Sequence, residues 1–127
     1  MFSHFFMVLD GLRPDAIEEK PVITSAGDNR YKLSWVLPRE PKTPQDYTIE
    51  VRESPSFRWQ MITTGVQDLH YILDNVHPER DYMYRVIVEN DYGESDPSPS
   101  VSLRHGPGQF SAWFQTCKLA LNHFRGS

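Results

Sequence analysis

Short runs of alternating apolar and polar residues, separated by turn residues, fill the chain between residues 21 and 103. Neighbouring side chains of a β-strand point to opposite faces, so this period of two predicts strands with one buried and one exposed face. The clearest run has its apolar residues at Tyr82, Tyr84, Val86 and Val88. With a first edge strand at residues 22–25, we expect seven strands and an all-β sandwich of two antiparallel sheets.

The large side chains that the alternation turns inward are expected to form the core of this sandwich. Aromatic residues placed in this way are far more often packed in a core than used in a binding site. Loss of the Trp35 side chain should therefore cost about 3 to 5 kcal/mol of stability. We assign structural roles to five residues: Trp35, Tyr47, Leu73, Tyr82 and Tyr84.

Glycine and proline predict where the strands end. Gly65 follows the run at residues 57–63 and is expected to be a turn residue. Residues 90–93, with the sequence Asn-Asp-Tyr-Gly, predict a hairpin-like turn. The last run, residues 95–103, carries two prolines, which donate no ladder hydrogen bond. This run is therefore expected to be an edge strand.

The sequence divides into three parts on composition. Residues 1–20 combine an apolar leader with a charged connector, which we interpret as a short exposed linker or one helical turn. His4 interrupts the leader and no basic region precedes it, so a signal peptide is not favoured. Residues 21–104 form the sandwich, and Gly106, Pro107 and Gly108 mark its end.

An apolar stripe with helical spacing runs along residues 105–127 and predicts an amphipathic helix. Such a stripe requires a partner: the chain's own sandwich, the leader, a second copy or another protein's groove. A homodimer through this helix is therefore one of the alternatives. Cys117 lies on the stripe, where we interpret it as a buried thiol. The five tail residues expected to contact a partner are Phe110, Trp113, Phe114, Leu121 and Phe124.

A second candidate surface for partners is the outer face of the sheet that contains residues 47–53 and 82–88. Exposed apolar side chains with charges around them are typical of contact sites. The plainer interpretation is a solvated sheet with a cross-strand pair between Glu50 and Arg85. The five residues that we expect on this surface, including the turn after the strand, are Arg52, Met83, Arg85, Ile87 and Tyr92.

No arrangement of residues predicts catalysis, a cofactor or a metal site. The five histidines show no metal-ligand spacing with one another or with the single cysteine. A formal net charge of -4 gives no reason to expect nucleic acid, and no apolar run is long enough for a membrane span. One cysteine excludes an intrachain disulfide, and no Asn-x-Ser/Thr sequon occurs, which favours a reducing compartment.

Three ordered motifs in the predicted sandwich resemble the fibronectin type III family. Leu33, Ser34 and Trp35 are similar to the family's second strand with its tryptophan. Residues 76–86 resemble its corner between the fifth and sixth strands, and residues 90–98 its next turn and last strand. The resemblance implies a seven-stranded immunoglobulin-like sandwich. It also implies that the Tyr82 hydroxyl bonds to nearby backbone.

Within that family, residues 47–53 followed by Trp59 are similar to modules of titin, twitchin, obscurin and myosin light chain kinase. This resemblance implies a non-catalytic interaction and spacer module of an intracellular scaffold, in the cytoplasm at the cytoskeleton or sarcomere. Its partners would be other proteins or neighbouring immunoglobulin and fibronectin domains. The alternative is an extracellular module of an adhesion or receptor protein.

Overall fold

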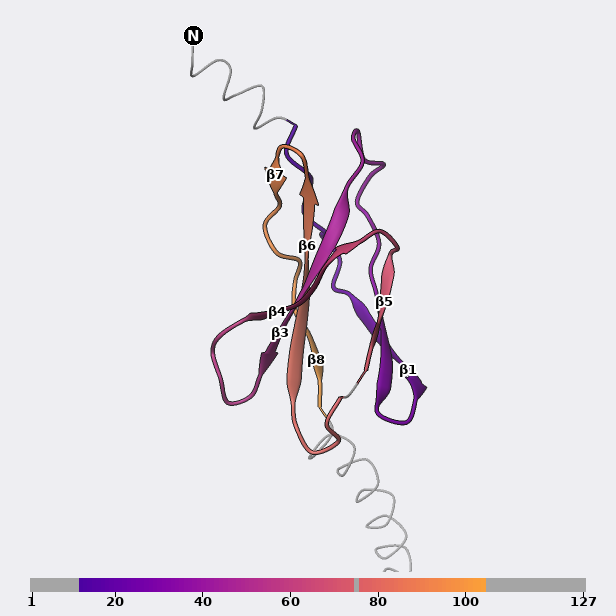
Figure 1. Ribbon diagram of the computed structural model, residues 1–127, viewed down its shortest axis with the longest axis vertical. Helices are drawn as coiled ribbons and strands as arrows, with labels where there is room; N and C mark the ends of the chain where they lie inside the picture. Colours follow the sequence, from indigo (N-terminus) through magenta and orange to yellow (C-terminus); the bar gives the residue numbers. More distant parts are fainter. Residues whose placement is uncertain (1–11, 75, 105–127) are drawn as a thin grey trace, which may run out of the picture.

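A computed structural model describes residues 12–74 and 76–104 of the 127-residue chain. The expected leader and the expected helix at residues 105–127 lie outside the described residues. In the described part, the chain forms eight strands and no helix (Figure 1). The strands are β1 (Val22–Gly27), β2 (Arg30–Ser34), β3 (Asp46–Glu53), β4 (Gln60–Val66), β5 (His70–Leu73), β6 (Tyr82–Asn90), β7 (Gly93–Glu94) and β8 (Val101–Leu103).

The strands form two antiparallel sheets that lie as separate layers (Figure 1). The smaller sheet has the order β1-β2-β5, and the larger has the order β4-β3-β6-β7, with β8 also paired to β6. The all-β sandwich expected from the sequence is confirmed. The described chain begins at the end where β7 lies and leaves past β8 at the opposite end (Figure 1).

The core lies between the sheets and draws on both of them. Trp35, directly after β2, packs edge-on against Tyr47 of β3, with 5.3 Å between the ring centroids. The expected core positions of Trp35, Tyr47, Leu73 and Tyr84 are confirmed, because each is at most 4% exposed. The buried apolar residues of this cluster are Ile17, Leu33, Trp35, Tyr47, Ile49, Leu73, Val76, Tyr84, Val86 and Val88.

The connector before β1 contributes to this core, which corrects the expectation of an exposed linker. Ile17 is 1% exposed and belongs to the buried cluster. Apart from Ala16, its neighbours at residues 15–20 are charged, so no apolar periodicity marked Ile17 in the sequence. The packed domain therefore begins before residue 21.

The last predicted strand is interrupted, which corrects the expectation of one strand over residues 95–103. β7 ends at Glu94 and β8 begins at Val101, and both pair with β6. Between them, Ser95 and Ser98 accept hydrogen bonds through their hydroxyl oxygens from the amides of β6, each at 2.9 Å. Serine hydroxyls thus accept hydrogen bonds from the backbone N–H groups on this edge of β6, where the proline-containing segment forms no regular ladder.

Gly65 lies within β4 and not in a turn, so the expected turn at this residue is wrong. On β3, Tyr47 pairs with Val66 and Ile49 with Thr63, which leaves one more residue on β4 than on its partner. This irregularity is a β-bulge, and Gly65 has a φ of 74°, which glycine adopts without steric cost. The hairpin expected at residues 90–93 is confirmed by the pairing of Asn90 with Gly93.

The tyrosine expected at the corner before β6 has the predicted bond. The backbone N–H of His77 donates to the hydroxyl oxygen of Tyr82 at 3.1 Å. In the same corner, the amide of Arg80 donates to the carbonyl oxygen of His77 at 3.2 Å, which closes the turn. The phenol therefore ties the chain that leaves the smaller sheet to the first residue of β6.

Replacing Tyr82 by phenylalanine is expected to lower the free energy of unfolding by about 1 to 2 kcal/mol. The variant keeps the ring but leaves the His77 amide without its acceptor. Urea unfolding followed by tryptophan fluorescence measures the change. Tyr92→Phe is the matched control, because Tyr92 is 40% exposed and its loss of a hydroxyl should change stability by less than about 0.5 kcal/mol. Equal stability of the two variants would contradict a structural role for this bond.

Candidate interaction surface

The outer face of the larger sheet places charged side chains in rows across its strands. Glu50 on β3 pairs directly with Arg85 on β6. In the next outward row, Arg52 on β3 is opposite Met83 on β6, and Met83 is opposite Ser102 on β8. Because alternate residues of a strand share a face, these side chains point away from the core. The larger sheet thus presents a polar face with an arginine in each of two adjacent rows.

A tryptophan from outside the strand ladder covers part of this face. Trp59 lies just before β4, and the guanidinium carbons of Arg85 and Arg52 lie 4.2 Å and 5.3 Å from its ring centroid. Each guanidinium is within the distance at which a cation is attracted to an aromatic face. The ring therefore holds both arginine side chains in fixed positions on the sheet.

Arg85 is also paired with a carboxylate. Its Nε donates to the Glu50 Oε1 at 2.7 Å, and the two side chains are 25% and 19% exposed. The cross-strand pair between Glu50 and Arg85 is therefore present. Arg52 instead contacts the Met83 sulfur at 2.8 Å, through Nη2. The two arginines differ in that only Arg85 has its charge balanced on this face.

The structure does not assemble the apolar patch expected from Met83, Ile87 and Tyr92. Ile87 is only 7% exposed, so the expectation that it is available on the surface is wrong. Tyr92 is exposed at the tip of the hairpin after β6. The five-residue separation of Arg85 and Asn90 places that hairpin about 17 Å along the strand from the arginine rows. Arg52, Met83 and Arg85 remain together, and their use by a partner stays a prediction.

Sequence reasoning missed the exposed apolar residues of the β3–β4 loop and the start of β4. Phe57 is 88% exposed, Met61 is 61% exposed, and Trp59 packs on arginine side chains and not in the core. The spacing of Phe57, Trp59 and Met61 at every second residue indicated an ordinary strand face. The available signal was Pro55 with a serine on each side, which marks a loop in which Phe57 has no sheet to pack on.

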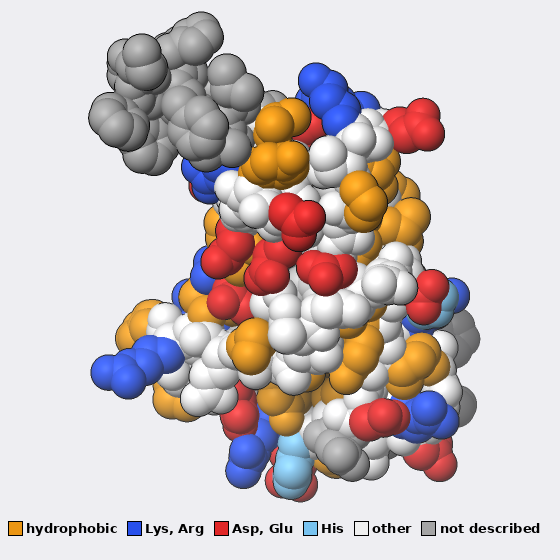
Figure 2. All heavy atoms as spheres, turned by 45° about the horizontal axis from the view of Figure 1, so that its top comes forward, with side chains coloured by type: hydrophobic (Ala, Val, Ile, Leu, Met, Phe, Trp, Pro, Cys, Tyr) orange, Lys and Arg blue, Asp and Glu red, His pale blue; other side chains and the backbone are white. Residues whose placement is uncertain are grey.

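The end of the sandwich near β7 carries acidic side chains, in contrast to the two rows that contain arginine. Asp46, Glu89 and Glu94 occupy one row across β3, β6 and β7. Figure 2 brings this end forward and shows acidic side chains gathered on it. Like charges directly opposite each other destabilise a sheet. In this row, the Glu89 carboxylate accepts a hydrogen bond from the Thr48 hydroxyl at 2.8 Å.

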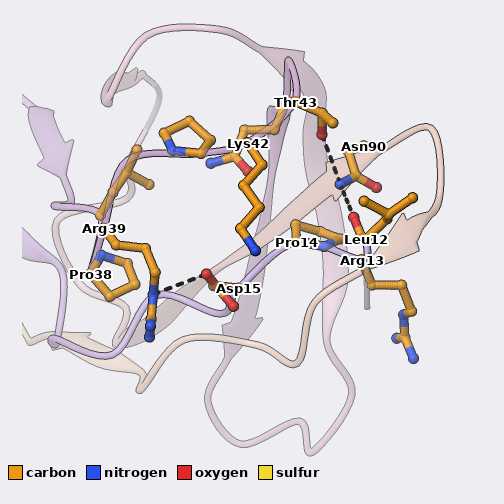
Figure 3. A pocket seen from close by; sticks show the side chains of 12 residues that line it. Leu12, Arg13, Pro14, Asp15, Pro38, Arg39, Lys42, Thr43 and Asn90 are labelled. Carbon is orange, nitrogen blue, oxygen red and sulfur yellow. Dashed lines mark hydrogen bonds and ion pairs between the residues drawn. The ribbon is translucent and has the colours of Figure 1, made fainter. Parts of the chain in front are cut away.

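A small cavity lies where the connector passes along the loop before β3 (Figure 3). The Asn90 side-chain amide donates to the Leu12 carbonyl oxygen at 2.8 Å and to the Thr43 hydroxyl at 3.3 Å. Nearby, Arg39 pairs with Asp15 at 3.0 Å. The cavity holds about 50 Å³, well below the size of a ligand pocket. These contacts fasten the connector to the sandwich.

Ionisable groups in the described residues form no reactive cluster. No three His, Cys, Asp or Glu side chains among them are placed to hold a metal ion. Burial raises the pKa of the Tyr84 hydroxyl because its phenolate would lose hydration, and the neighbouring Tyr82 adds to the effect. Tyr84 belongs to the core and not to a cleft, so this shift reports packing. Among the described residues, no helix is long and apolar enough to cross a membrane.

The stack of Trp59 on Arg85 should be measurable as a coupling energy. In a double-mutant cycle with Trp59→Ala and Arg85→Ala, we expect the two changes to be coupled by about 0.5 to 1 kcal/mol. Thermal unfolding of the four proteins gives this value. A cycle of Trp59→Ala with Arg30→Ala is the control, because Arg30 lies on the other sheet and pairs with Asp74. Equal coupling in both cycles would contradict the stack.

Comparisons with known proteins agree with this architecture. The sequence model of the fibronectin type III domain family matches residues 9–104 of this chain. The chain is 32% identical over 90 residues to the muscle M-line assembly protein unc-89 of Caenorhabditis elegans, covering 68% of this chain and 1% of that protein. It is 27% identical over 97 residues to the putative receptor-type tyrosine-protein phosphatase mosPTP-1 of Aedes aegypti, covering 69% of this chain and 7% of that protein.

Among solved structures, the titin kinase with its flanking domains superposes with a TM-score of 0.65 at 22% identity. That match covers 79% of this chain and 18% of the titin chain. The chain spans a small fraction of the relatives it matches, each of which contains much more than this domain. The family model covers most of the chain, including the buried connector and both sheets. The chain belongs to the fibronectin type III family.

Proposed function

We propose that this chain is a non-catalytic interaction and spacer module of an intracellular muscle or cytoskeletal scaffold. The observation that carries the proposal is the path of the chain, which enters the sandwich at one end and leaves at the other (Figure 1). Modules with this path can be joined end to end, so that each adds its length to the string. The similarity to unc-89, a muscle M-line assembly protein, supports a muscle setting.

The interaction role rests on the outer face of the larger sheet. Arg52 and Arg85 are held by the Trp59 ring, so they lose little side-chain freedom when they bind a partner. Arginine and tryptophan are the residue types enriched where binding energy concentrates. A homodimer through the predicted helix at residues 105–127 remains a further proposal, for which the tail sequence is the support.

Staining of striated muscle cells with an antibody against this chain tests the intracellular setting. We expect regular striations after the cells are permeabilised and no signal on intact cells. Excess purified chain, mixed with the antibody before staining, should compete for it and abolish the striations, which controls for specificity. Staining of intact, unpermeabilised cells would contradict the proposal.

The second candidate function is an extracellular module of a receptor or adhesion protein. The observation that favours it is the similarity to mosPTP-1, whose name describes a receptor-type phosphatase. The same staining experiment separates the two candidates, because an extracellular module is accessible without permeabilisation. A single result therefore supports one setting and excludes the other.

A further inference from the structure

A groove opens at the end of the sandwich from which the chain leaves, between the β3–β4 loop and β8. The loop projects away from the larger sheet (Figure 1). The groove has a volume of about 320 Å³, which is at the lower end of the range for ligand sites. Its lining includes Arg52, Ser54, Phe57, Met83, Ser102 and Arg104. This volume suits a few side chains of a bound peptide.

The strand register sets the two arginines on opposite sides of the groove. Arg52 is opposite Met83, which is opposite Ser102, so one complete row crosses β3, β6 and β8. Arg104 follows Ser102 by two residues and shares its outward direction. With about 4.8 Å between strands and 3.3 Å per residue, the backbones of Arg52 and Arg104 lie about 12 Å apart.

Both arginines lack a carboxylate partner among residues 12–74 and 76–104. Arg52 contacts the Trp59 ring and the Met83 sulfur, and Arg104 forms no ion pair with a described residue. Four other arginines do pair with a carboxylate: Arg30, Arg39, Arg80 and Arg85. The groove also includes Asp81, so two arginines and one aspartate give its lining a formal charge of +1. The groove lining is therefore more positive than the chain as a whole, whose net charge is -4, and this favours an anionic ligand in the groove.

The groove lining also includes apolar residues. Phe57 is 88% exposed, and Pro55 and Met83 belong to the same lining. An exposed phenylalanine gains free energy when a partner removes its surface from water. Ser54 and Ser102 add hydroxyl groups to the lining that can donate and accept hydrogen bonds.

From these features we infer that the groove binds a short acidic segment of a partner protein, with an aromatic or large aliphatic side chain between two carboxylates. Carboxylates four residues apart in an extended chain are about 13 Å apart, which matches the spacing of Arg52 and Arg104. The apolar side chain between them covers Phe57. A long polyanion or an anionic membrane would also meet the acidic row of Asp46, Glu89 and Glu94, which repels it. The inference rests on the proposed interaction role and names the chemistry of the partner.

Nuclear magnetic resonance of the full-length chain, labelled with ¹⁵N, tests the groove directly. The probe is the blocked peptide acetyl-Glu-Ser-Phe-Ser-Glu-amide. We expect amide shifts concentrated at Ser54, Phe57 and Ser102. A peptide with lysine in place of both glutamates should cause no such shifts, and one with alanine in place of phenylalanine should bind more weakly.

Charge reversal provides the matched variants. Arg52→Glu combined with Arg104→Glu should weaken peptide binding by about tenfold or more, because two attractions become two repulsions. Lys20→Glu combined with Lys32→Glu makes the same change of net charge at two exposed residues outside the groove, and it should leave the affinity unchanged. Both double variants must show the dispersed spectrum of a folded sandwich before the affinities are compared.

Several results would overturn the inference. Equal weakening by the two double variants, or peptide shifts outside the groove, would show that no specific site exists. Binding to phosphatidylserine vesicles without binding to the peptide would identify a lipid surface instead. Groove shifts that grow with protein concentration alone would identify a second copy as the occupant. If muscle striations are seen in staining while the peptide fails to bind, only the groove inference falls and the proposed function stands.

Discussion

Replacing Trp35 by alanine is expected to lower the free energy of unfolding by about 3 to 5 kcal/mol, the loss measured when a large aromatic residue is removed from a core. Trp35 is 4% exposed and packs edge-on against Tyr47, so its removal leaves a cavity between the two sheets. Whole domains are stable by about 5 to 15 kcal/mol, so the variant should be partly unfolded near 37 °C. Urea unfolding followed by circular dichroism measures the loss.

A phenylalanine at the same position separates packing from hydrogen bonding. The indole Nε1 of Trp35 is buried and has no hydrogen-bond partner among the described residues. Trp35→Phe removes this unsatisfied donor, which offsets part of the lost packing. We therefore expect Trp35→Phe to cost less than half as much as Trp35→Ala. Equal losses for the two variants would show that the ring does not pack as the structure describes.

Replacing Ile17 by alanine is expected to cost about 2 to 5 kcal/mol, although Ile17 precedes the first strand. Its side chain is 1% exposed and lies in the same cluster as residues from both sheets. The change therefore creates a cavity in the common core and does not merely loosen a linker. Thermal and urea unfolding of the full-length chain give the loss.

Val22→Ala is the matched control for Ile17. Val22 begins β1, is 57% exposed, and should lose less than about 0.5 kcal/mol on truncation. If Ile17→Ala were as mild as Val22→Ala, the connector would not belong to the domain. The comparison thus decides where the folded module begins.

The elements predicted best from the sequence are those fixed by local patterns. The alternation at Tyr82 to Val88 predicts β6 because one strand face is buried along its length. Asn90 and Gly93 predict the hairpin for different reasons. The Asn90 carboxamide oxygen accepts a hydrogen bond from the Tyr92 amide at 2.8 Å, and Gly93 adopts a φ of 145°, which residues with a side chain rarely reach. In these places the sequence and the tertiary structure favour the same conformation.

Residues whose environment depends on distant parts of the chain could not be predicted in this way. Ile17 is the one large apolar residue at residues 15–20, and only the approach of both sheets buries it. Ile87 alternates correctly onto the outer face, yet β6 has neighbours on both sides and the residue is covered. Periodicity predicts the face of the sheet to which a side chain points. It does not predict whether side chains on the neighbouring strands cover that residue.

The candidate surface was predicted in part, for the same reason. Glu50 and Arg85 could be paired from the sequence because antiparallel register follows from two alternating strands. The contribution of Trp59 depends on how the loop before β4 folds over the sheet, which no local pattern specifies. The groove depends on the same loop and on β8, which are more than thirty residues apart in the sequence.

Native-state hydrogen exchange of the full-length chain tests most directly whether this chain is one rigid module, as a spacer requires. The amides of Trp35, Ser54, Val86 and Ser98 donate hydrogen bonds at the ends and edges of the sheets, Trp35 beside the smaller sheet and the other three beside the larger one. We expect them to exchange through a single global opening with the same free energy, and Ile17→Ala to lower all four values equally. If the amides of the two sheets exchanged with free energies that differ by more than about 2 kcal/mol, the sheets would open separately. That result would contradict a single rigid module.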